Sequence, residues 1–175
     1  MTVGNPTYFN YYKLSDNSIL NTEIIDTAGQ EAYRKVTENY YKKADFCILV
    51  YDITNRRDFD EIKNYYIVKI KELCKKSVKV ILVRNKIDLE EKRQISYKEG
   101  AHLAFLNNYL FIETSCLENK NVRKVFEKIF GIGRFFYKNN EANLNEKKVL
   151  DRNELFILDL KNKKYINKLS KYIKI

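Results

Sequence analysis

Several features typical of membrane and secreted proteins are missing from this sequence of 175 residues. No apolar run reaches the roughly 18 residues that a membrane-spanning helix needs. Residues Met1–Pro6 have neither a basic start nor an apolar stretch, so we expect no secretory signal. The three cysteines, Cys47, Cys74 and Cys116, are an odd number without metal-ligand spacing. Free thiols in a reducing compartment fit this pattern best.

Acidic residues are also in deficit, because 33 Lys and Arg face 23 Asp and Glu, which gives a net charge of +10. Residues 138–175 hold ten basic and five acidic residues, while elsewhere Lys and Arg mostly alternate with acids. Such alternation is typical of solvated faces rather than of a nucleic-acid surface. We therefore expect no nucleic-acid partner. The basic tail predicts at most a weak electrostatic contact with anionic membrane.

Two nearly continuous apolar runs, 45–53 and 78–83, are typical of parallel strands that are buried on both faces. Residues 109–113 predict a shorter third strand. An aromatic-rich segment at 7–14 and an alternating segment at 19–26 flank a cluster of turn residues. These two segments predict a hairpin.

Helical spacings of apolar residues alternate with these strands. They predict helices over 57–76 and 122–137, and Asn55 is placed to cap the first of them. Ser96-Tyr97-Lys98-Glu99 has the form of a capping box that opens another helix. Strands that alternate with helices indicate an α/β fold with a mostly parallel sheet. In such folds ligands bind beyond the carboxyl ends of the strands.

Three short motifs stand at those strand ends. They are Asp26-Thr27-Ala28-Gly29-Gln30-Glu31, Asn85-Lys86-Ile87-Asp88 and Glu113-Thr114-Ser115. Turn chemistry alone would suit Asn85 and Ser115 equally well, and an unrelated α/β domain is the other reading. Together, in this order, the motifs resemble the third, fourth and fifth guanine-nucleotide motifs of small GTPases of the Ras superfamily, over about Thr2–Tyr137.

The resemblance implies how a guanine base is recognised. The Asp88 carboxylate can accept hydrogen bonds from the ring N–H and the exocyclic amine of guanine, whereas adenine would leave it unpaired. By resemblance, Asn85 meets the imidazole-ring nitrogen of the base, and the stem of Lys86 covers the ring face. The backbone around Ser115 and Cys116 meets the guanine carbonyl oxygen.

The resemblance also implies bound GTP or GDP with Mg²⁺. Asp26 resembles the carboxylate that holds the metal through water, and the Thr2 hydroxyl is the expected direct ligand. Gly29 permits close approach of its N–H to the γ-phosphate. Gln30 matches the catalytic glutamine that orients the attacking water.

Three segments look like Rab sequences: Tyr33–Thr37, Tyr40–Ala44 and Tyr51–Thr54. Ras or another branch of the superfamily is the alternative. Effectors and regulators of the Rab type are the expected partners, through residues near Thr2–Phe9 and Gln30–Ala44. The expected function is a GTP-binding and GTP-hydrolysing switch in vesicle trafficking. The competing hypothesis is a non-enzymatic interaction module that binds partners without turnover.

The sequence departs from the family because no glycine is followed by lysine, as a phosphate-binding P-loop requires. We expect a truncated P-loop small-GTPase fold, with helices on both faces of the sheet and with the first strand and P-loop absent. Each hydrogen bond that a P-loop makes to the nucleotide phosphates is worth about 1.5–3 kcal/mol. Loss of the P-loop would lower the affinity for GTP by roughly four to seven decades, so nucleotide binding should be weak and GTP hydrolysis negligible.

Because the first strand is central in the family's sheet, its absence would open two interior edges. One hypothesis is a truncated product; the other is a reorganised protein in which residues 155–160 fill part of the gap. We predict a GTPase-like domain over 1–137 and a basic, largely flexible tail over 138–175.

Smaller departures concern single residues. Arg84 replaces the family's usual glycine and Cys116-Leu117 its usual Ala-Lys, and both are expected to loosen base recognition. No cysteine follows Cys116, so we expect no prenylation site and a cytoplasmic protein peripheral to endomembranes.

Overall fold

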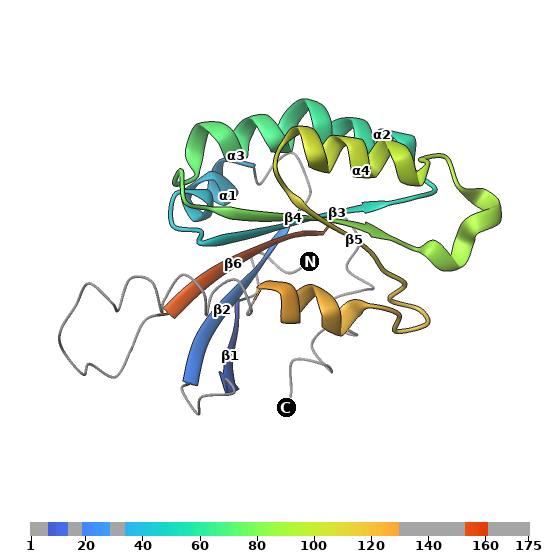
Figure 1. Ribbon diagram of the computed structural model, residues 1–175. Helices are drawn as coiled ribbons and strands as arrows, with labels where there is room; N and C mark the ends of the chain where they lie inside the picture. The colour runs from blue at the N-terminus through green and yellow to red at the C-terminus, as the bar shows by residue number, and fades with distance from the viewer. Residues whose placement is uncertain (1–6, 14–18, 29–33, 130–152, 161–175) are drawn as a thin grey trace.

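A computed structural model describes residues 7–13, 19–28, 34–129 and 153–160 (Figure 1). The named elements are β1 (Thr7–Lys13), β2 (Ile19–Ala28), α1 (Arg34–Tyr41), β3 (Phe46–Asp52), α2 (Arg56–Glu61), η2 (Ile62–Tyr66), α3 (Ile67–Leu73), β4 (Lys79–Asn85), η3 (Ile87–Lys92), α4 (Tyr97–Leu106), β5 (Leu110–Glu113) and β6 (Asn153–Leu160). Residues 122–129 form a further helix.

The strands form one sheet of six in the order β1-β2-β6-β3-β4-β5. β1 pairs with β2 in antiparallel register, Thr7 opposite Ile25 and Lys13 opposite Ile19, so the predicted hairpin is confirmed. All other neighbouring strands are parallel, which confirms the mostly parallel sheet. The carboxyl ends of β3, β4 and β5 therefore meet at one edge of the sheet.

β6 occupies the place between β2 and β3, although it comes last in the chain (Figure 1). All eight of its residues pair with β2, along Asn21–Ala28, whereas Phe46–Leu49 of β3 pairs with only four of them. One of the two sequence hypotheses expected this arrangement. The strand lies inside the predicted flexible tail, and the division of the chain at residue 137 stays a prediction.

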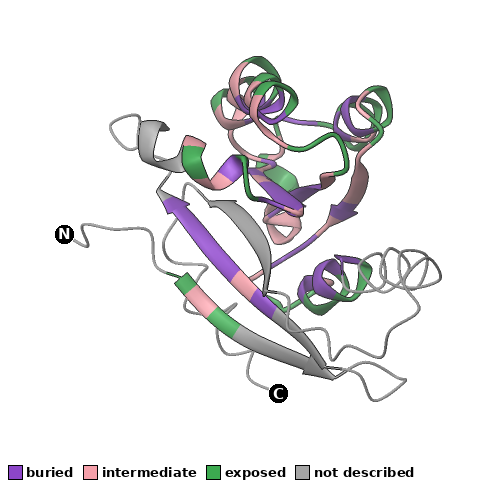
Figure 2. Cartoon of the chain, turned by 90° about the vertical axis from the view of Figure 1, so that its left-hand side faces the viewer, coloured by how far each residue is buried: buried purple, intermediate pink, exposed green. Residues whose placement is uncertain are grey.

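Helices cover both faces of the sheet, as the sequence predicted. Figure 1 shows α1, the α2–η2–α3 stretch and α4 above the sheet and the helix of residues 122–129 below it. Alternate residues of β3 face the two sides: Cys47 and Leu49 join the core under the upper helices, while Phe46 and Ile48 join the lower one. Figure 2 shows buried inner faces and exposed outer faces on these helices.

Local capping explains where two of the upper helices begin. The Asn55 side chain accepts a hydrogen bond from the Asp58 N–H at the start of α2, as predicted. Ser96 and Glu99 exchange side-chain-to-backbone hydrogen bonds, so the predicted capping box is confirmed. The long helix has one π-turn at η2 and ends at Leu73, three residues earlier than predicted.

Helix α1 lies in a segment for which the sequence analysis predicted no helix. No helix in the described part of the chain is both long and apolar enough to cross a membrane.

Candidate functional site

Asn85 closes β4 at the carboxyl edge of the sheet and is buried. Its side-chain Oδ1 accepts hydrogen bonds from the Thr114 hydroxyl at 3.1 Å and from the Cys116 N–H at 3.2 Å. These two donors assign the oxygen end of the amide. The Nδ2 group makes no hydrogen bond to any residue that the structure describes, so it can donate to an acceptor such as a purine ring nitrogen.

Asp88 and Ser115 are joined directly. The Ser115 hydroxyl donates to Asp88 Oδ1 at 2.5 Å and itself accepts from the Glu118 N–H at 3.0 Å. Ser115 is fully buried, and its backbone exchanges two hydrogen bonds with Lys120. Because the backbone groups of Glu118 and Lys120 hold Ser115 in place, the Ser115 hydroxyl fixes the position of one Asp88 carboxylate oxygen. The Asp88 carboxylate is therefore presented as a double acceptor at the same edge as Asn85.

Lys86 has a left-handed backbone, with φ of 67° and ψ of 35°, which costs a residue with a side chain roughly 1–2 kcal/mol. Its ammonium group forms an ion pair with Asp52 at the end of β3. Asp52 also accepts hydrogen bonds from the N–H and the hydroxyl of Thr54, at 2.8 and 2.7 Å. The lysine stem thus spans from β4 to β3. A strained residue held in this way is typical of a functional site.

Arg84 lies directly before Asn85 and is almost fully buried. It forms an ion pair with Glu113, its register partner on β5, and its guanidinium lies 5.1 Å from the Tyr97 ring centroid. Burial lowers the pKa of Arg84, and the Glu113 carboxylate opposes that effect. The pair clamps β4 to β5 directly before Asn85 on β4 and at Glu113, the first residue of the other base-side motif. A loosening of base recognition by Arg84, which the sequence suggested, stays a prediction.

On the predicted phosphate side, only Asp26 belongs to the described residues. It is buried near the carboxyl end of β2, separated from β4 by β6 and β3. Thr2, Gly29 and Gln30 lie outside the described residues. Within the described ranges, no group of three or more His, Cys, Asp or Glu side chains is arranged to hold a metal ion.

The structure thus brings together the predicted base-side residues Asn85, Asp88, Ser115 and Cys116, with Lys86 between them. The sequence analysis missed two supporting groups. Thr114, within the Glu-Thr-Ser motif, could have been found because a buried hydroxyl beside a buried amide needs a partner. Asp52 gave no such signal, since its ion pair with Lys86 joins the last residue of β3 to the residue that follows β4.

Comparison with known proteins shows one family. A model described as the Ras family matches residues 1–132. Ras-related protein Rab-1 of Theileria parva is 41% identical over 114 residues, which are 65% of this chain and 52% of that protein. Ras-related protein RABA6a of Arabidopsis thaliana is 40% identical over 115 residues, 66% of this chain and 49% of that protein.

Ras-related protein Rab-11B of Dictyostelium discoideum is 36% identical over a longer stretch of 131 residues, 74% of this chain and 59% of that protein. The chain spans about half the length of the curated relatives it matches.

Proposed function

This chain belongs to the Ras family of small GTPases and is Rab-like, and we propose that it acts as a guanine-nucleotide-binding switch in vesicle trafficking. Effectors and regulators of the Rab type are the proposed partners, through residues near Thr2–Phe9 and Gln30–Ala44. The proposed location is cytoplasmic and peripheral to endomembranes.

The observation that carries the proposal is the hydrogen-bonded base-side cluster. Asn85 offers an amide donor while its oxygen is used by Thr114 and Cys116. Asp88 offers a carboxylate that Ser115 orients. Guanine complements this pattern. Its imidazole-ring nitrogen can accept from the Asn85 amide, while its ring N–H and exocyclic amine can both donate to the Asp88 carboxylate. Adenine lacks those two donors and would leave the carboxylate unpaired, which supports guanine selectivity.

For the phosphate side we propose that Asp26 holds Mg²⁺ through water, that Thr2 binds it directly, and that Gly29 and Gln30 face the γ-phosphate and the attacking water. Bound Mg²⁺ neutralises charge on the phosphates. The buried carboxylate of Asp26 at the carboxyl edge of the sheet is compatible with that role. Because the 175 residues contain no Gly-Lys pair, we expect weak nucleotide binding and negligible hydrolysis by this chain alone.

Calorimetric titration of the purified chain with GDP and with ADP, in the presence of Mg²⁺, tests this function. GDP is expected to bind more tightly, and Asp88→Asn to lower GDP affinity by about 10–150-fold, since a charged acceptor is lost. Asp60→Asn, at an exposed position on α2, is the matched control and should leave the affinity unchanged. Equal affinity for GDP and ADP would contradict the proposal, and binding of neither would favour the non-enzymatic interaction module.

A further inference from the structure

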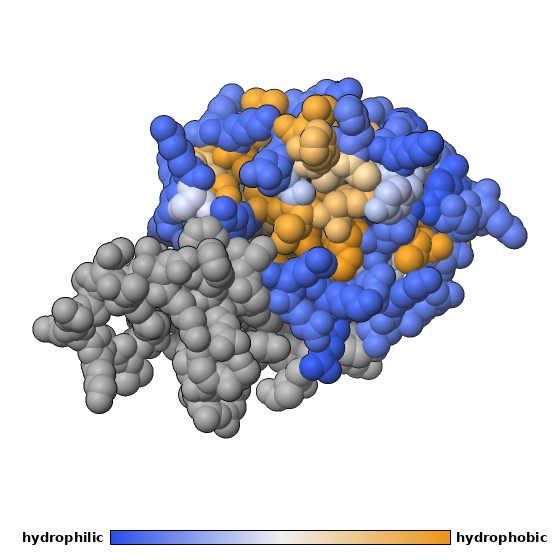
Figure 3. All heavy atoms as spheres, in the orientation of Figure 1, coloured by the Kyte–Doolittle hydropathy of each residue, from blue (hydrophilic) through white to orange (hydrophobic). Residues whose placement is uncertain are grey.

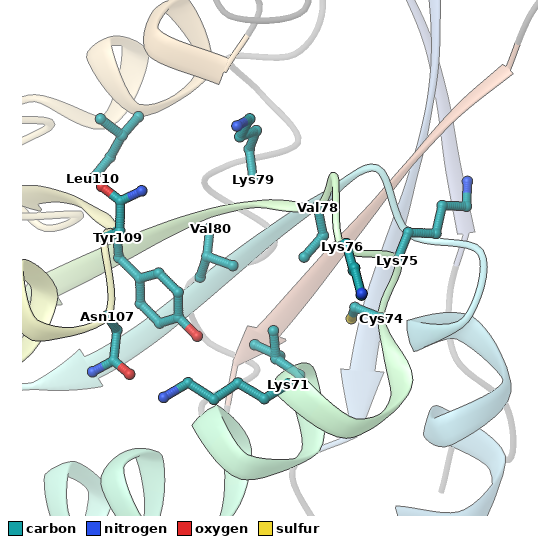
Figure 4. Close-up of a pocket in the computed structure, with 12 residues that line it drawn as sticks. Lys71, Cys74, Lys75, Lys76, Val78, Lys79, Val80, Asn107, Tyr109 and Leu110 are labelled. Carbon is teal, nitrogen blue, oxygen red and sulfur yellow. The ribbon is translucent and has the colours of Figure 1, made fainter.

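A second site lies at the opposite edge of the sheet, where α3 and α4 end and where β4 and β5 begin (Figure 4). It is a cavity of about 650 Å³, which we call the basic pocket. Its walls combine apolar side chains, two asparagines, a tyrosine, a cysteine and four lysines. They are Ile70, Lys71, Cys74, Lys75, Lys76, Val78, Lys79, Val80, Asn107, Asn108, Tyr109 and Leu110.

The basic pocket carries more positive charge than the acidic groups and helix ends around it neutralise. None of its lining residues is acidic, and Asp45 neutralises Lys75 at 3.0 Å. Two helix ends contribute roughly −0.5 charge each, so Lys71 and Lys76 alone leave a surplus of about one positive charge. Lys71 and Lys76 form no ion pair with any acidic residue that the structure describes, and both are exposed. The pocket therefore favours an anion.

Tyr109 adds a neutral donor beside the lysines. Its hydroxyl is buried and has no hydrogen-bond partner among the described residues. Burial raises the pKa of Tyr109 to about 12, so the hydroxyl keeps its proton at neutral pH. Figure 4 shows this hydroxyl directed toward the side chain of Lys71. The end of α4 fixes the backbone of Tyr109, because the Tyr109 N–H donates to the Ala104 carbonyl. Asn108, between α4 and Tyr109, has the left-handed backbone that is common at helix ends.

Large apolar side chains are exposed next to the basic pocket. Phe105 and Leu106, the last residues of α4, are 81% and 65% exposed and directly precede the lining residues Asn107 and Asn108. Figure 3 shows an apolar area on this face of the molecule, bounded by hydrophilic surface. Exposed aromatic and aliphatic groups beside unneutralised lysines are the combination that binds at the interface of an anionic bilayer.

We propose that the basic pocket is a contact site for a membrane that carries anionic phospholipids. Lys71 and Lys76 bind lipid phosphate groups, while Phe105 and Leu106 enter the interface. Since the pocket lies at the edge of the sheet opposite Asn85, a membrane bound there leaves the candidate nucleotide site facing away. The proposal does not depend on nucleotide binding.

Sedimentation of the full chain with vesicles tests the site. The chain is expected to bind vesicles of phosphatidylcholine mixed with phosphatidylserine, and not phosphatidylcholine alone. Lys71→Gln/Lys76→Gln should weaken the partition coefficient by about 25-fold, at about fivefold for each lysine near an anionic surface. The matched control is Lys124→Gln/Lys128→Gln, which removes the same charge from exposed positions on the other face of the sheet. Equal loss in both double variants would overturn the pocket as the site.

Two further arms separate the lipid from a soluble anion. Phe105→Ser/Leu106→Ser should abolish the part of vesicle binding that survives high salt, because screening removes the electrostatic part only. Inositol hexakisphosphate is a soluble source of the same phosphate chemistry. In a calorimetric titration it should bind the chain far more weakly than vesicles do. Strong binding of that anion at Lys71 and Lys76 without vesicle binding would overturn the membrane proposal. Unchanged thermal unfolding of each variant shows that the fold is retained.

Discussion

Asn85 and Asp88 owe their geometry to hydrogen bonds from the loop that follows β5. Thr114 and Cys116 fix the Asn85 amide, and Ser115 fixes one oxygen of Asp88. Motif spacing predicted that the ligand-facing residues gather at one edge, because parallel strands share a carboxyl edge. Spacing does not specify which hydrogen bond each side chain makes, since that depends on packing between strands.

The Arg84–Glu113 ion pair predicts a non-additive response to mutation. Glu113→Gln leaves a buried guanidinium without its carboxylate, and Arg84 Nε and Nη1 already have no hydrogen-bond partner among the described residues. We expect a loss of about 3 kcal/mol in the free energy of unfolding, at the low end for a buried pair because the Glu113 side chain is 31% exposed. Arg84→Met/Glu113→Leu should lose less than Glu113→Gln alone.

Urea unfolding of Arg84→Met, Glu113→Leu and the double variant Arg84→Met/Glu113→Leu measures this coupling. Losses that simply add would show that the two side chains do not depend on each other.

At the scale of helices and strands, sequence patterns predicted most of the architecture. The apolar runs became β3 and β4 with ends within about two residues, and the capping box opened α4 as expected. Periodicity did not reveal α1, which lies within a segment interpreted as a partner-binding region. It also did not reveal the basic pocket. Its four lysines lie within residues 71–79, but Asn107, Tyr109 and Leu110 complete its walls from the α4–β5 connection, and only the tertiary fold brings them beside the lysines.

The start of α4 carries a pH-dependent contribution to stability. The Arg56 guanidinium, at 2.7 Å, and then the Ser96 N–H lower the pKa of Glu99 from 4.5 to about 2. A carboxylate with a lowered pKa stabilises the fold above its ordinary pKa, and this contribution is lost as the pH falls toward about 2. Since Glu99 is solvent-exposed, we expect no more than about 0.5–1 kcal/mol.

Comparison of the wild type with Glu99→Gln by urea unfolding tests this, because glutamine retains the capping-box hydrogen bond and removes only the charge. The difference in stability should be constant near neutral pH and shrink below pH 4.5. A difference that is independent of pH would mean that the carboxylate charge contributes nothing.

For the whole molecule, the placement of β6 decides whether the sheet is continuous. Its backbone pairs with β2 on one side and β3 on the other, so a residue without an N–H breaks the ladder in the middle of the sheet. Ile157→Pro should therefore cost about 3 kcal/mol or more in the free energy of unfolding. Ile157→Val retains the N–H and is the control. Similar unfolding midpoints for both variants would contradict the position of β6.

NMR titration of the chain with GDP and with ADP tests whether a guanine site lies at the carboxyl ends of β4 and β5. We expect GDP-dependent shifts of the backbone amides of Asn85, Lys86, Ser115 and Cys116, with much smaller shifts for ADP. Equal shifts with both nucleotides, or shifts concentrated at Asn107–Tyr109 in the basic pocket, would contradict it.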